Sequence, residues 1–271
     1  MIPCGTQAGW SLRYSCSYNG PWATMDDSSD NYYVDLFAGK GEWSGLYPNS
    51  DETERLGTIL RFLGAARKAL SGDETLRILD VGCGRGWLTS MVQGYGRVEG
   101  VEPVKGVVEE ARRRYPEMRF HDGNPQTLLD NGLAHAYEIV ICTEVIEHVP
   151  ASQQEEFVGA VSRLLKPGGY AIVTTPRGKY RKKAARAGYA VQPVEDWLTE
   201  DQVRRLFQTH GLAARDFRRV FVPLHRLSFA QRLASGRRIQ RLADRLRLRW
   251  LLEGARSALG FYQAWLFQSD A

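Results

Sequence analysis

The sequence predicts an α/β protein built on a doubly wound, mostly parallel sheet with helices on both faces. The main observation is that short apolar runs alternate with amphipathic segments through residues 76–176. A glycine-rich turn at 82–86 directly follows the first apolar run. Because parallel strands need helical crossovers, this alternation favours a parallel sheet whose ligands bind beyond the carboxyl ends of its strands.

The predicted elements follow one another in a regular order. Apolar runs predict strands at 76–82, 96–103, 118–123, 137–145 and 170–176. Amphipathic spacing and end signals predict helices at 51–70, 86–95, 104–116, 152–165 and 201–212. At the last helix, Thr199 and Gln202 form a capping-box pattern, and Gly211 is a stop signal.

Length and composition limit the class of protein. A chain of 271 residues, 43% hydrophobic and 25% charged, suits one large domain with appended segments and excludes wholesale disorder. No apolar run reaches the ~20 residues of a membrane span, and residues 1–20 lack a signal-peptide pattern. Cys83 and Cys142 resemble small buried residues rather than halves of a disulfide. A cytoplasmic protein is therefore expected.

The chain divides into four predicted regions. A loose leader is expected at 1–31 and a helical lid at 32–74. The strand and helix alternation places a ligand-binding sheet domain at 75–222, followed by a basic, helical C-terminal extension at 223–271. Aromatic residues cluster in the lid, where they would either close over a ligand or pack on the sheet. They include Tyr32, Tyr33, Trp43 and Tyr47.

Positive charge is concentrated in two segments. Residues 177–186 hold six Lys or Arg and no acid, and residues 213–256 hold twelve Arg and three acids. Although the whole chain has a net charge of +5, the remainder holds 18 basic and 28 acidic residues. Such a local positive field favours a phosphorylated substrate, nucleic acid or a membrane surface. Residues 229–252 set apolar side chains against a row of Arg, a pattern typical of a membrane-surface helix, a dimer face or a lid.

The turn at 82–86 suits a polar cofactor. Gly82, Gly84 and Gly86 permit positive φ and bring bare backbone close to a ligand, and the following helix offers free N–H donors. A dinucleotide-binding G-x-G-x-x-G pattern would need glycine where this chain has Trp87. A nicotinamide-dependent oxidoreductase is therefore the least favoured interpretation.

Acidic residues end the next two predicted strands. Glu102, followed by Pro103, ends the second strand, where a carboxylate can accept hydrogen bonds from both hydroxyls of a ribose. Asp122 and Gly123 end the third strand, where an acid can accept from an exocyclic amine. Together with the glycine turn, these strand ends predict an adenosyl-binding site.

Five motifs occur in order over residues 75–215: LDVGCGRG, VEGVEP, FHDG, CTEVIEHVP and LLKPGGYAIVTTP. In order and spacing they resemble the class I S-adenosylmethionine-dependent methyltransferases, which have a Rossmann-like fold. The resemblance implies that S-adenosyl-L-methionine is the cofactor and S-adenosyl-L-homocysteine the product. It further implies these cofactor-binding residues: Asp80 and the backbone of Gly82, Cys83 and Gly84 at the methionine portion, Glu102 with adjacent Pro103 at the ribose, Asp122 and Gly123 at the adenine, and Thr143 and Glu144 at the floor.

The segment TEVIEHVP holds the catalytic candidate. Methyl transfer from a sulfonium is an in-line displacement, and a hydroxyl acceptor must also lose its proton. Because imidazoles titrate near neutral pH, His148 is the predicted general base, with a structural role as the alternative. The spacing of Glu144, Glu147 and His148 also resembles a metal-ligand motif of ubiquinone-biosynthesis O-methyltransferases and small-RNA 2′-O-methyltransferases. Since Val149 stands where the RNA enzymes have a further His, no metal is predicted.

The predicted activity is methylation of an oxygen, rather than a nitrogen or carbon, of a small metabolite such as a natural product, a sugar or a quinone-like phenol. The basic segment after Pro176 suits an anionic acceptor. Two alternatives stay open: an RNA 2′-O-methyltransferase and a catalytically silent cofactor-binding partner protein. Nucleic acid is not the expected partner, because aromatic residues for base stacking are sparse in the basic extension. That extension is instead a candidate for peripheral membrane contact.

Overall fold

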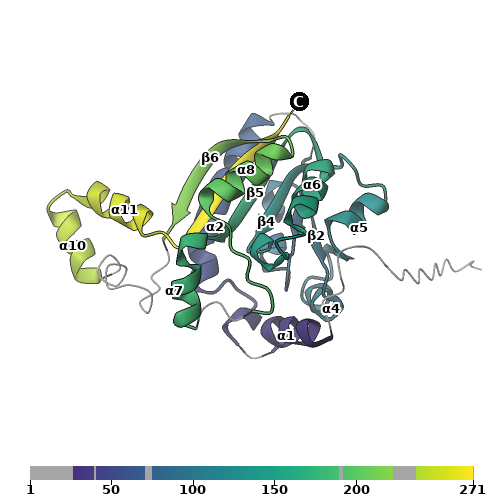
Figure 1. Cartoon of the computed structure of the whole chain (residues 1–271), viewed down its shortest axis with the longest axis horizontal. Coiled ribbons are helices and arrows are strands. Elements are labelled where there is room, and N and C mark those ends of the chain that lie inside the picture. The colour runs from purple at the N-terminus through teal and green to yellow at the C-terminus, as the bar shows by residue number, and fades with distance from the viewer. Residues whose placement is uncertain (1–26, 40, 71–74, 189–191, 222–235, 271) are drawn as a thin grey trace, which may run out of the picture.

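The computed structural model describes residues 27–39, 41–70, 75–188, 192–221 and 236–270. They form a seven-stranded sheet in the order β3-β2-β1-β4-β5-β7-β6, with β7 antiparallel to both of its neighbours (Figure 1). The strands are β1 (Arg77–Val81), β2 (Arg97–Glu102), β3 (Arg119–Asp122), β4 (Tyr137–Thr143), β5 (Leu165–Pro176), β6 (Leu212–Val220) and β7 (Tyr262–Ser269). The predicted α/β, mostly parallel fold is confirmed.

Helices cover both faces of the sheet. The described α-helices, of which α10 and α11 extend away from the sheet (Figure 1), are α1 (Asp27–Ala38), α2 (Ser50–Ala69), α3 (Trp87–Met91), α4 (Lys105–Arg114), α5 (Pro125–Asp130), α6 (Gln154–Leu164), α7 (Arg181–Arg186), α8 (Glu200–Thr209), α10 (Arg237–Arg245) and α11 (Arg249–Ala258). Phe62 of α2 lies in one apolar cluster with Ile78, and Phe157 of α6 lies in another with Leu79. Because consecutive strand residues point to opposite faces, each apolar run supplies both clusters. None of the described helices is long and apolar enough to cross a membrane.

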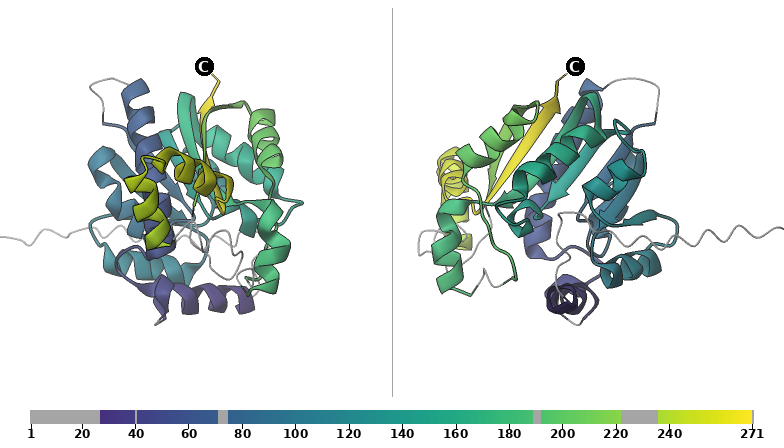
Figure 2. Two further views of the ribbon diagram at one scale, coloured as in Figure 1. Left: turned by 90° about the vertical axis from the view of Figure 1, so that its left-hand side faces the viewer. Right: turned by 45° about the vertical axis from the view of Figure 1, so that its right-hand side comes forward.

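The strand order reverses between β1 and β4. β1 pairs in parallel with β2 on one side and with β4 on the other. Right-handed crossovers therefore send α3 and α4 to one face of the sheet and α6 to the other. Sheets of this kind bind their ligands at such a reversal, beyond the carboxyl ends of the strands. In Figures 1 and 2, α1 lies across this edge of the sheet.

Local signals set several element boundaries. The predicted capping box of α8 is present, with Thr199 N–H donating to Gln202 Oε1 at 2.8 Å and Gln202 N–H donating to Thr199 Oγ1 at 3.3 Å. β5 begins at Leu165, whereas the sequence predicts a strand only from 170. The Lys-Pro-Gly-Gly segment continues the strand because Leu165 pairs with Tyr137, and a register shift absorbs the extra residues.

The C-terminal region differs from the prediction of a helical extension over 223–271. Helices are present at α10 and α11, but residues 262–269 form β7, which lies between β5 and β6 within the sheet. Its apolar side chains pack into both faces of the core. The prediction of helix here was wrong, although the aromatic-rich run at 261–267, directly after Gly260, is a local signal typical of a strand. At the other end, α1 already begins at residue 27, inside the predicted leader. The remainder of that leader, 1–26, is outside the described residues.

Candidate active site

The turn between β1 and α3 presents bare backbone at the strand-order reversal. Gly82 and Gly84 have φ values of 64° and 51°. The N–H groups of Gly82 and Cys83 both donate to the carbonyl oxygen of Val101, at 2.8 and 3.1 Å, which fixes the turn on β2. A Cβ atom at Gly82 would lie 2.4 Å from Val145 Cγ2, so a side chain there would displace the segment after β4.

Glu102 is buried at the end of β2. Its Oε2 accepts a hydrogen bond from the Gly84 N–H and its Oε1 from the Val104 N–H, both at 3.1 Å. Burial raises the pKa of Glu102 to about 7, although these two hydrogen bonds oppose the rise. Pro103, the next residue, is exposed. The carboxyl therefore lies directly beside the glycine turn, as the sequence predicts.

Asp122 and Gly123 follow β3 next to Glu102. Glu102 and Asp122 are partners in the parallel register of β2 and β3, and the Gly123 N–H donates to the Glu102 carbonyl at 3.0 Å. The Asp122 side chain is exposed, and Gly123 turns the chain with φ at 128°. The acids predicted to contact ribose and adenine thus end neighbouring strands.

Asp80 and Cys83 are buried beneath the turn. Asp80 Oδ2 accepts from Thr89 Oγ1 at 2.7 Å, which ties β1 to α3. Burial raises the pKa of Asp80 to about 7 against the opposing effect of the Thr89 hydrogen bond. Burial likewise raises the pKa of the Cys83 thiol, which packs with Phe120 as a small apolar side chain. Contact of Asp80 with the methionine portion of a cofactor stays a prediction.

Thr143 and Glu144 lie where β4 ends. Thr143 pairs with Thr174 of β5, and Glu144 has φ at 57°, an uncommon value for a residue with a side chain. Glu144 Oε1 accepts from Thr174 Oγ1 at 2.8 Å and lies 3.9 Å from Arg55 Nε. Burial raises the pKa of Glu144 to about 8 against the opposing effect of the Arg55 charge.

Glu147 and His148 follow in the short 3₁₀ helix Ile146–His148. Glu147 Oε2 accepts from Thr175 Oγ1 at 2.9 Å, and burial raises the pKa of this carboxyl to about 8. His148 Nδ1 lies 2.9 Å from the Val194 carbonyl oxygen. A carbonyl only accepts, so in the neutral imidazole Nδ1 carries the proton and Nε2 keeps its lone pair. His148 Nε2 lies 3.9 Å from Glu147 Oε1.

Aromatic residues of α1 cover this edge of the sheet. Tyr33 is buried, and its ring centroid lies 6.3 Å from that of His148. Phe37 packs on the glycine turn, where a Cβ at Gly84 would lie 3.4 Å from its ring. Among the aromatic residues of the predicted lid, Tyr33 therefore lies at the site, whereas Tyr47 is 77% exposed.

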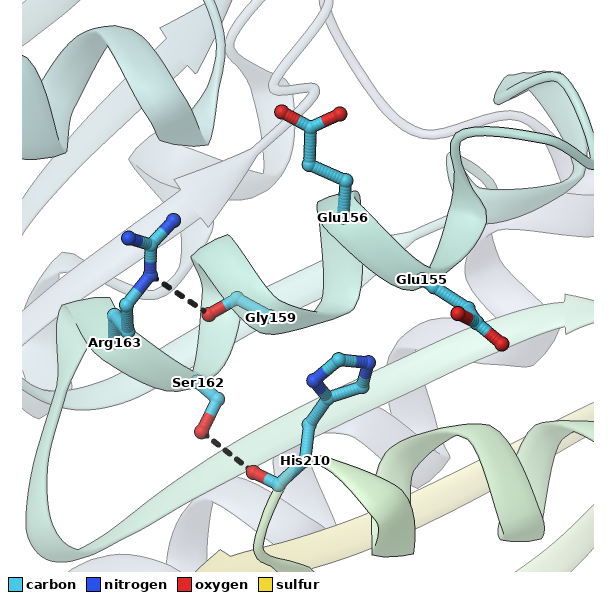
Figure 3. A pocket seen from close by; sticks show the side chains of 6 residues that line it. All are labelled: Glu155, Glu156, Gly159, Ser162, Arg163 and His210. Carbon is cyan, nitrogen blue, oxygen red and sulfur yellow. Dashed lines mark hydrogen bonds between the residues drawn. The ribbon is translucent and has the colours of Figure 1, made fainter.

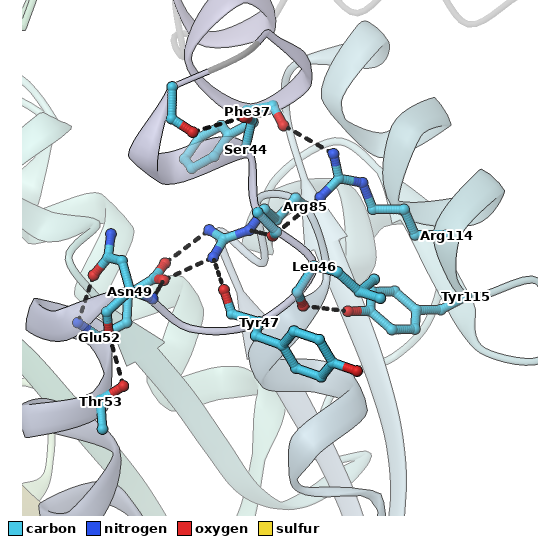
Figure 4. Close-up of polar contacts among 12 residues, drawn as sticks. Phe37, Ser44, Leu46, Tyr47, Asn49, Glu52, Thr53, Arg85, Arg114 and Tyr115 are labelled. Carbon is cyan, nitrogen blue, oxygen red and sulfur yellow. Dashed lines mark hydrogen bonds and ion pairs between the residues drawn. The ribbon is translucent and has the colours of Figure 1, made fainter.

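Arg85 ties the segment between α1 and α2 to the glycine turn (Figure 4). Its buried guanidinium donates from Nη1 and Nη2 to the two carboxylate oxygens of Glu52, both at 2.7 Å. Its Nε donates to the Gly45 carbonyl at 2.6 Å and its Nη2 to the Tyr47 carbonyl at 3.3 Å. Glu52 also completes the capping box of α2 with Asn49. A buried bidentate pair of this kind holds the predicted lid against the turn.

Comparison with known proteins identifies the family. A model of the family described as "Methyltransferase domain" matches residues 49–216, more than half of the chain. The chain belongs to the S-adenosylmethionine-dependent methyltransferases. This methyltransferase is similar to ubiquinone biosynthesis O-methyltransferase of Alkalilimnicola ehrlichii, at 36% identity over 113 residues that cover 40% of this chain and 44% of the relative. The chain spans about half the length of the curated relatives it matches.

Solved methyltransferases share the fold. The 1,6-didemethyltoxoflavin-N1-methyltransferase of Burkholderia thailandensis, with bound 1,6-didemethyltoxoflavin and S-adenosylhomocysteine, has a TM-score of 0.55 at 14% identity and covers 90% of this chain and 88% of its own. Magnesium protoporphyrin IX methyltransferase of Synechocystis PCC 6803, with bound S-adenosylmethionine, has a TM-score of 0.56 at 14% identity. The match covers 92% of this chain and 99% of the Synechocystis chain. These structures confirm the predicted class I methyltransferase fold. The match to the methyltransferase family model supports the predicted S-adenosylmethionine cofactor.

Two buried polar groups of the methyltransferase lack partners next to Glu144 and His148. The structure gives no hydrogen-bond partner, within its described ranges, to Arg55 Nη1 or to the Tyr33 hydroxyl. The Arg55 guanidinium lies 4.5 Å from the ring centroid of Tyr262 in β7. Sequence analysis missed Arg55, although a charge on the apolar stripe of α2, one turn before Ile59, was an available signal.

The Glu144, Glu147 and His148 side chains do not gather as metal ligands. Across the part of the chain that the structure describes, no three His, Cys, Asp or Glu side chains lie close enough to hold a metal ion. The two carboxylates are instead bonded to the hydroxyls of Thr174 and Thr175.

A surface pocket of the methyltransferase lies away from the edge of the sheet that holds the glycine turn (Figure 3). It lies between α6 and the end of α8, with Ser162 Oγ donating to the His210 carbonyl at 2.8 Å. β6 starts just after His210 and runs parallel to β5, so this pocket lies near the amino ends of the parallel strands. The residues that line it are Glu155, Glu156, Gly159, Ser162, Arg163 and His210.

Proposed function

We propose that this methyltransferase transfers a methyl group to an oxygen atom of a small metabolite, such as a quinone-like phenol. The observation that carries the proposal is His148, whose Nδ1 is engaged by the Val194 carbonyl and whose Nε2 keeps its lone pair beside Glu147. A hydroxyl must lose its proton as the new O–C bond forms, so a positioned base favours an oxygen acceptor. The names of the curated relatives, ubiquinone biosynthesis O-methyltransferases, support the same chemistry.

The carboxyl ends of β1, β2 and β3 have the groups that S-adenosylmethionine needs. Beyond its two backbone hydrogen bonds, the Glu102 carboxylate has lone pairs for ribose hydroxyls, and Asp122 lies at the next strand end for the adenine. We assign the bare backbone of 82–84 to the methionine portion, with Thr143 and Glu144 as the floor. These contacts, with those of Asp80, Pro103 and Gly123, complete the proposed cofactor site.

The proposed reaction uses few groups of the chain. When bound, the cofactor supplies an electrophilic sulfonium methyl group, and its sulfur keeps the electron pair of the broken bond. His148 Nε2 takes the proton of the acceptor hydroxyl while the oxygen attacks the methyl carbon. The Val194 carbonyl holds the orientation of the ring, so that Nε2 is the atom that takes the proton.

We assign the region around α1 and α2 as the lid of this site. Tyr33 and Phe37 lie over His148 and the glycine turn, and the buried Arg85 and Glu52 pair anchors the connection between the two helices. Excluding water in this way strengthens every charge interaction in the site and protects the sulfonium from hydrolysis.

The proposal is tested with labelled cofactor and a panel of phenols, catechols, sugars, amines and RNA. Methylated products are located by mass spectrometry, and transfer to a hydroxyl is expected. With the acceptor so found, His148→Gln is expected to lower kcat ~10²–10⁴-fold while leaving binding of S-adenosylhomocysteine unchanged.

His210→Gln is the matched control, because His210 lies at the opposite edge of the sheet, and its kcat should equal that of the native enzyme. Methylation of RNA or of an amine in place of a hydroxyl would refute the proposed substrate class. Native turnover by His148→Gln would show that His148 is not the base.

A further inference from the structure

The segment between β6 and β7 carries most of the exposed large apolar side chains of the described structure. Nine such side chains are exposed within those residues, and six of them lie at 239–251. Trp250 is 66% exposed and Leu246 55%. Figures 1 and 2 show α10 and α11 standing out from the body of the molecule. We call residues 237–258 the arm. Apolar groups gathered in this way mark an interaction surface.

The arm is also strongly cationic. It contains seven Arg, no Lys and two acids. Both acids lie near Arg249, with Asp244 Oδ1 at 3.7 Å from Nη1 and Glu253 Oε1 at 3.1 Å from Nε. Along α10 and its C-cap residue, exposed Arg side chains form one stripe and exposed apolar side chains form another. Each stripe has i, i+3, i+7 spacing, and the two are offset by one residue, or ~100° around the helix. The stripes are Arg238, Arg241 and Arg245, and Ile239, Leu242 and Leu246.

The arm is attached at the same edge of the sheet as the proposed active site. It follows Val220, the last residue of β6, and precedes Tyr262, the first residue of β7. Tyr262 pairs with Val220 on one side and with Pro176, the carboxyl end of β5, on the other. The exposed cationic residues of α7, which include Lys182 and Lys183, also follow the end of β5.

Two kinds of binding partner fit this surface poorly: a second copy of the arm and single-stranded nucleic acid. In a contact between two arms, Arg would face Arg, because both acids of each arm already lie beside Arg249. Single-stranded nucleic acid binds through stacked aromatic side chains, and Trp250 is the one aromatic residue of the arm. A bilayer with anionic headgroups complements both stripes, because phosphates pair with guanidinium groups and the interface accepts Leu, Ile and Trp.

We propose that the arm binds the surface of an anionic lipid bilayer. Bound in this way, the arm places the edge of the sheet that holds the proposed active site next to the membrane. The test uses the full chain and vesicles of phosphatidylcholine, either alone or mixed equally with phosphatidylglycerol. Co-sedimentation is expected with the mixed vesicles and not with phosphatidylcholine alone.

Two groups of substitutions test the contribution of each stripe to vesicle binding separately. Removing charge with Arg238→Gln, Arg241→Gln and Arg245→Gln is expected to lower partitioning about 100-fold, or about 3 kcal/mol. Leu242→Ser with Leu246→Ser is expected to lower it at least tenfold. The matched control is the triple variant Arg61→Gln, Arg204→Gln and Arg205→Gln, which removes equal charge from exposed positions on α2 and α8 and should bind as the native chain does.

Equal binding to both vesicle types, or equal loss in the control variant, would overturn the proposal. So would tighter binding to an RNA oligonucleotide than to mixed vesicles, or dimerisation without lipid that the apolar substitutions abolish. S-adenosylhomocysteine binding and circular dichroism of each variant should match the native chain, because the arm lies outside the core of the sheet.

Discussion

At the scale of a single residue, the proposed ribose contact of Glu102 predicts that cofactor binding depends on pH. Ribose hydroxyls would donate to the ionised carboxylate, but burial raises the pKa of Glu102 to about 7 in the free protein. The affinity for S-adenosylhomocysteine is therefore expected to fall by up to ~tenfold per pH unit below about pH 7. Titration calorimetry between pH 6 and 8 measures this slope.

Glu102→Gln should weaken binding by ~1–3 kcal/mol and flatten this dependence. The control is Glu109→Gln, an exposed position on α4, which should retain the native slope. An unchanged slope in Glu102→Gln would contradict the ribose assignment.

The unpartnered Tyr33 hydroxyl predicts opposite effects on stability and activity. A buried hydroxyl without a partner costs ~1–3 kcal/mol, so Tyr33→Phe should raise the Tm of the ligand-free enzyme. If the hydroxyl serves the acceptor or cofactor, the same change should lower kcat/KM. Scanning calorimetry and steady-state kinetics provide the two readouts, with half-buried Tyr32→Phe as the control. A rise in Tm with unchanged kinetics would remove Tyr33 from the site.

At the scale of elements, the Arg85 and Glu52 pair joins α2 to the glycine turn. Both side chains are at most 3% exposed, so Arg85→Met alone leaves a buried carboxylate unpaired and should cost ~3–5 kcal/mol of unfolding free energy. Adding Glu52→Leu should recover part of this loss, which urea denaturation would measure. The exposed pair of Arg204 and Asp201 is the control, and Arg204→Gln should cost ~0–1 kcal/mol. Equal losses in both pairs would contradict a special role for the buried pair.

The elements also show what can be predicted from a single sequence. The strands β1 to β5, the glycine turn and Glu102 were predictable because apolar runs, turn glycines and strand-end acids are local patterns. The role of Arg85 was not, because its partner Glu52 lies 33 residues earlier in the chain. Tyr262 reaches Arg55 only through the pairing of β7 with β5, a contact across most of the chain.

For the whole molecule, buried carboxyls set the pH dependence of stability. Burial raises the pKa values of Asp80 and Glu102 to about 7 and those of Glu144 and Glu147 to about 8. The folded state thus keeps protons that the unfolded chain releases above its ordinary carboxyl pKa. Each group therefore contributes stability that is fully present below the ordinary carboxyl pKa and is lost as the pH rises through the pKa of the folded state. The free energy of unfolding falls by up to ~1.4 kcal/mol per group and per pH unit over this range.

The Tm of the ligand-free enzyme is accordingly expected to fall between about pH 5 and 8 and to level off above this range. The opposite sign holds at low pH, where the hydrogen bond with His121 lowers the pKa of Glu99 to about 2, so stability is lost on acidification. Calorimetry across this range provides the measurement, and a Tm that rises steadily from pH 5 to 8 would contradict the burial of these four groups.

The place of β7 has a consequence for synthesis of the chain. Among the described strands, β6 pairs with β7 alone, and β7 lies at residues 262–269. While the ribosome still holds these residues, β5 has an open edge and β6 has no neighbour. Phe207 and Phe217, which pack on Phe267 and Trp265 in the folded protein, are then left uncovered and accessible to chaperones. The emergence of β7 from the ribosomal tunnel, rather than completion of β1 to β5, therefore sets the moment at which the sheet closes.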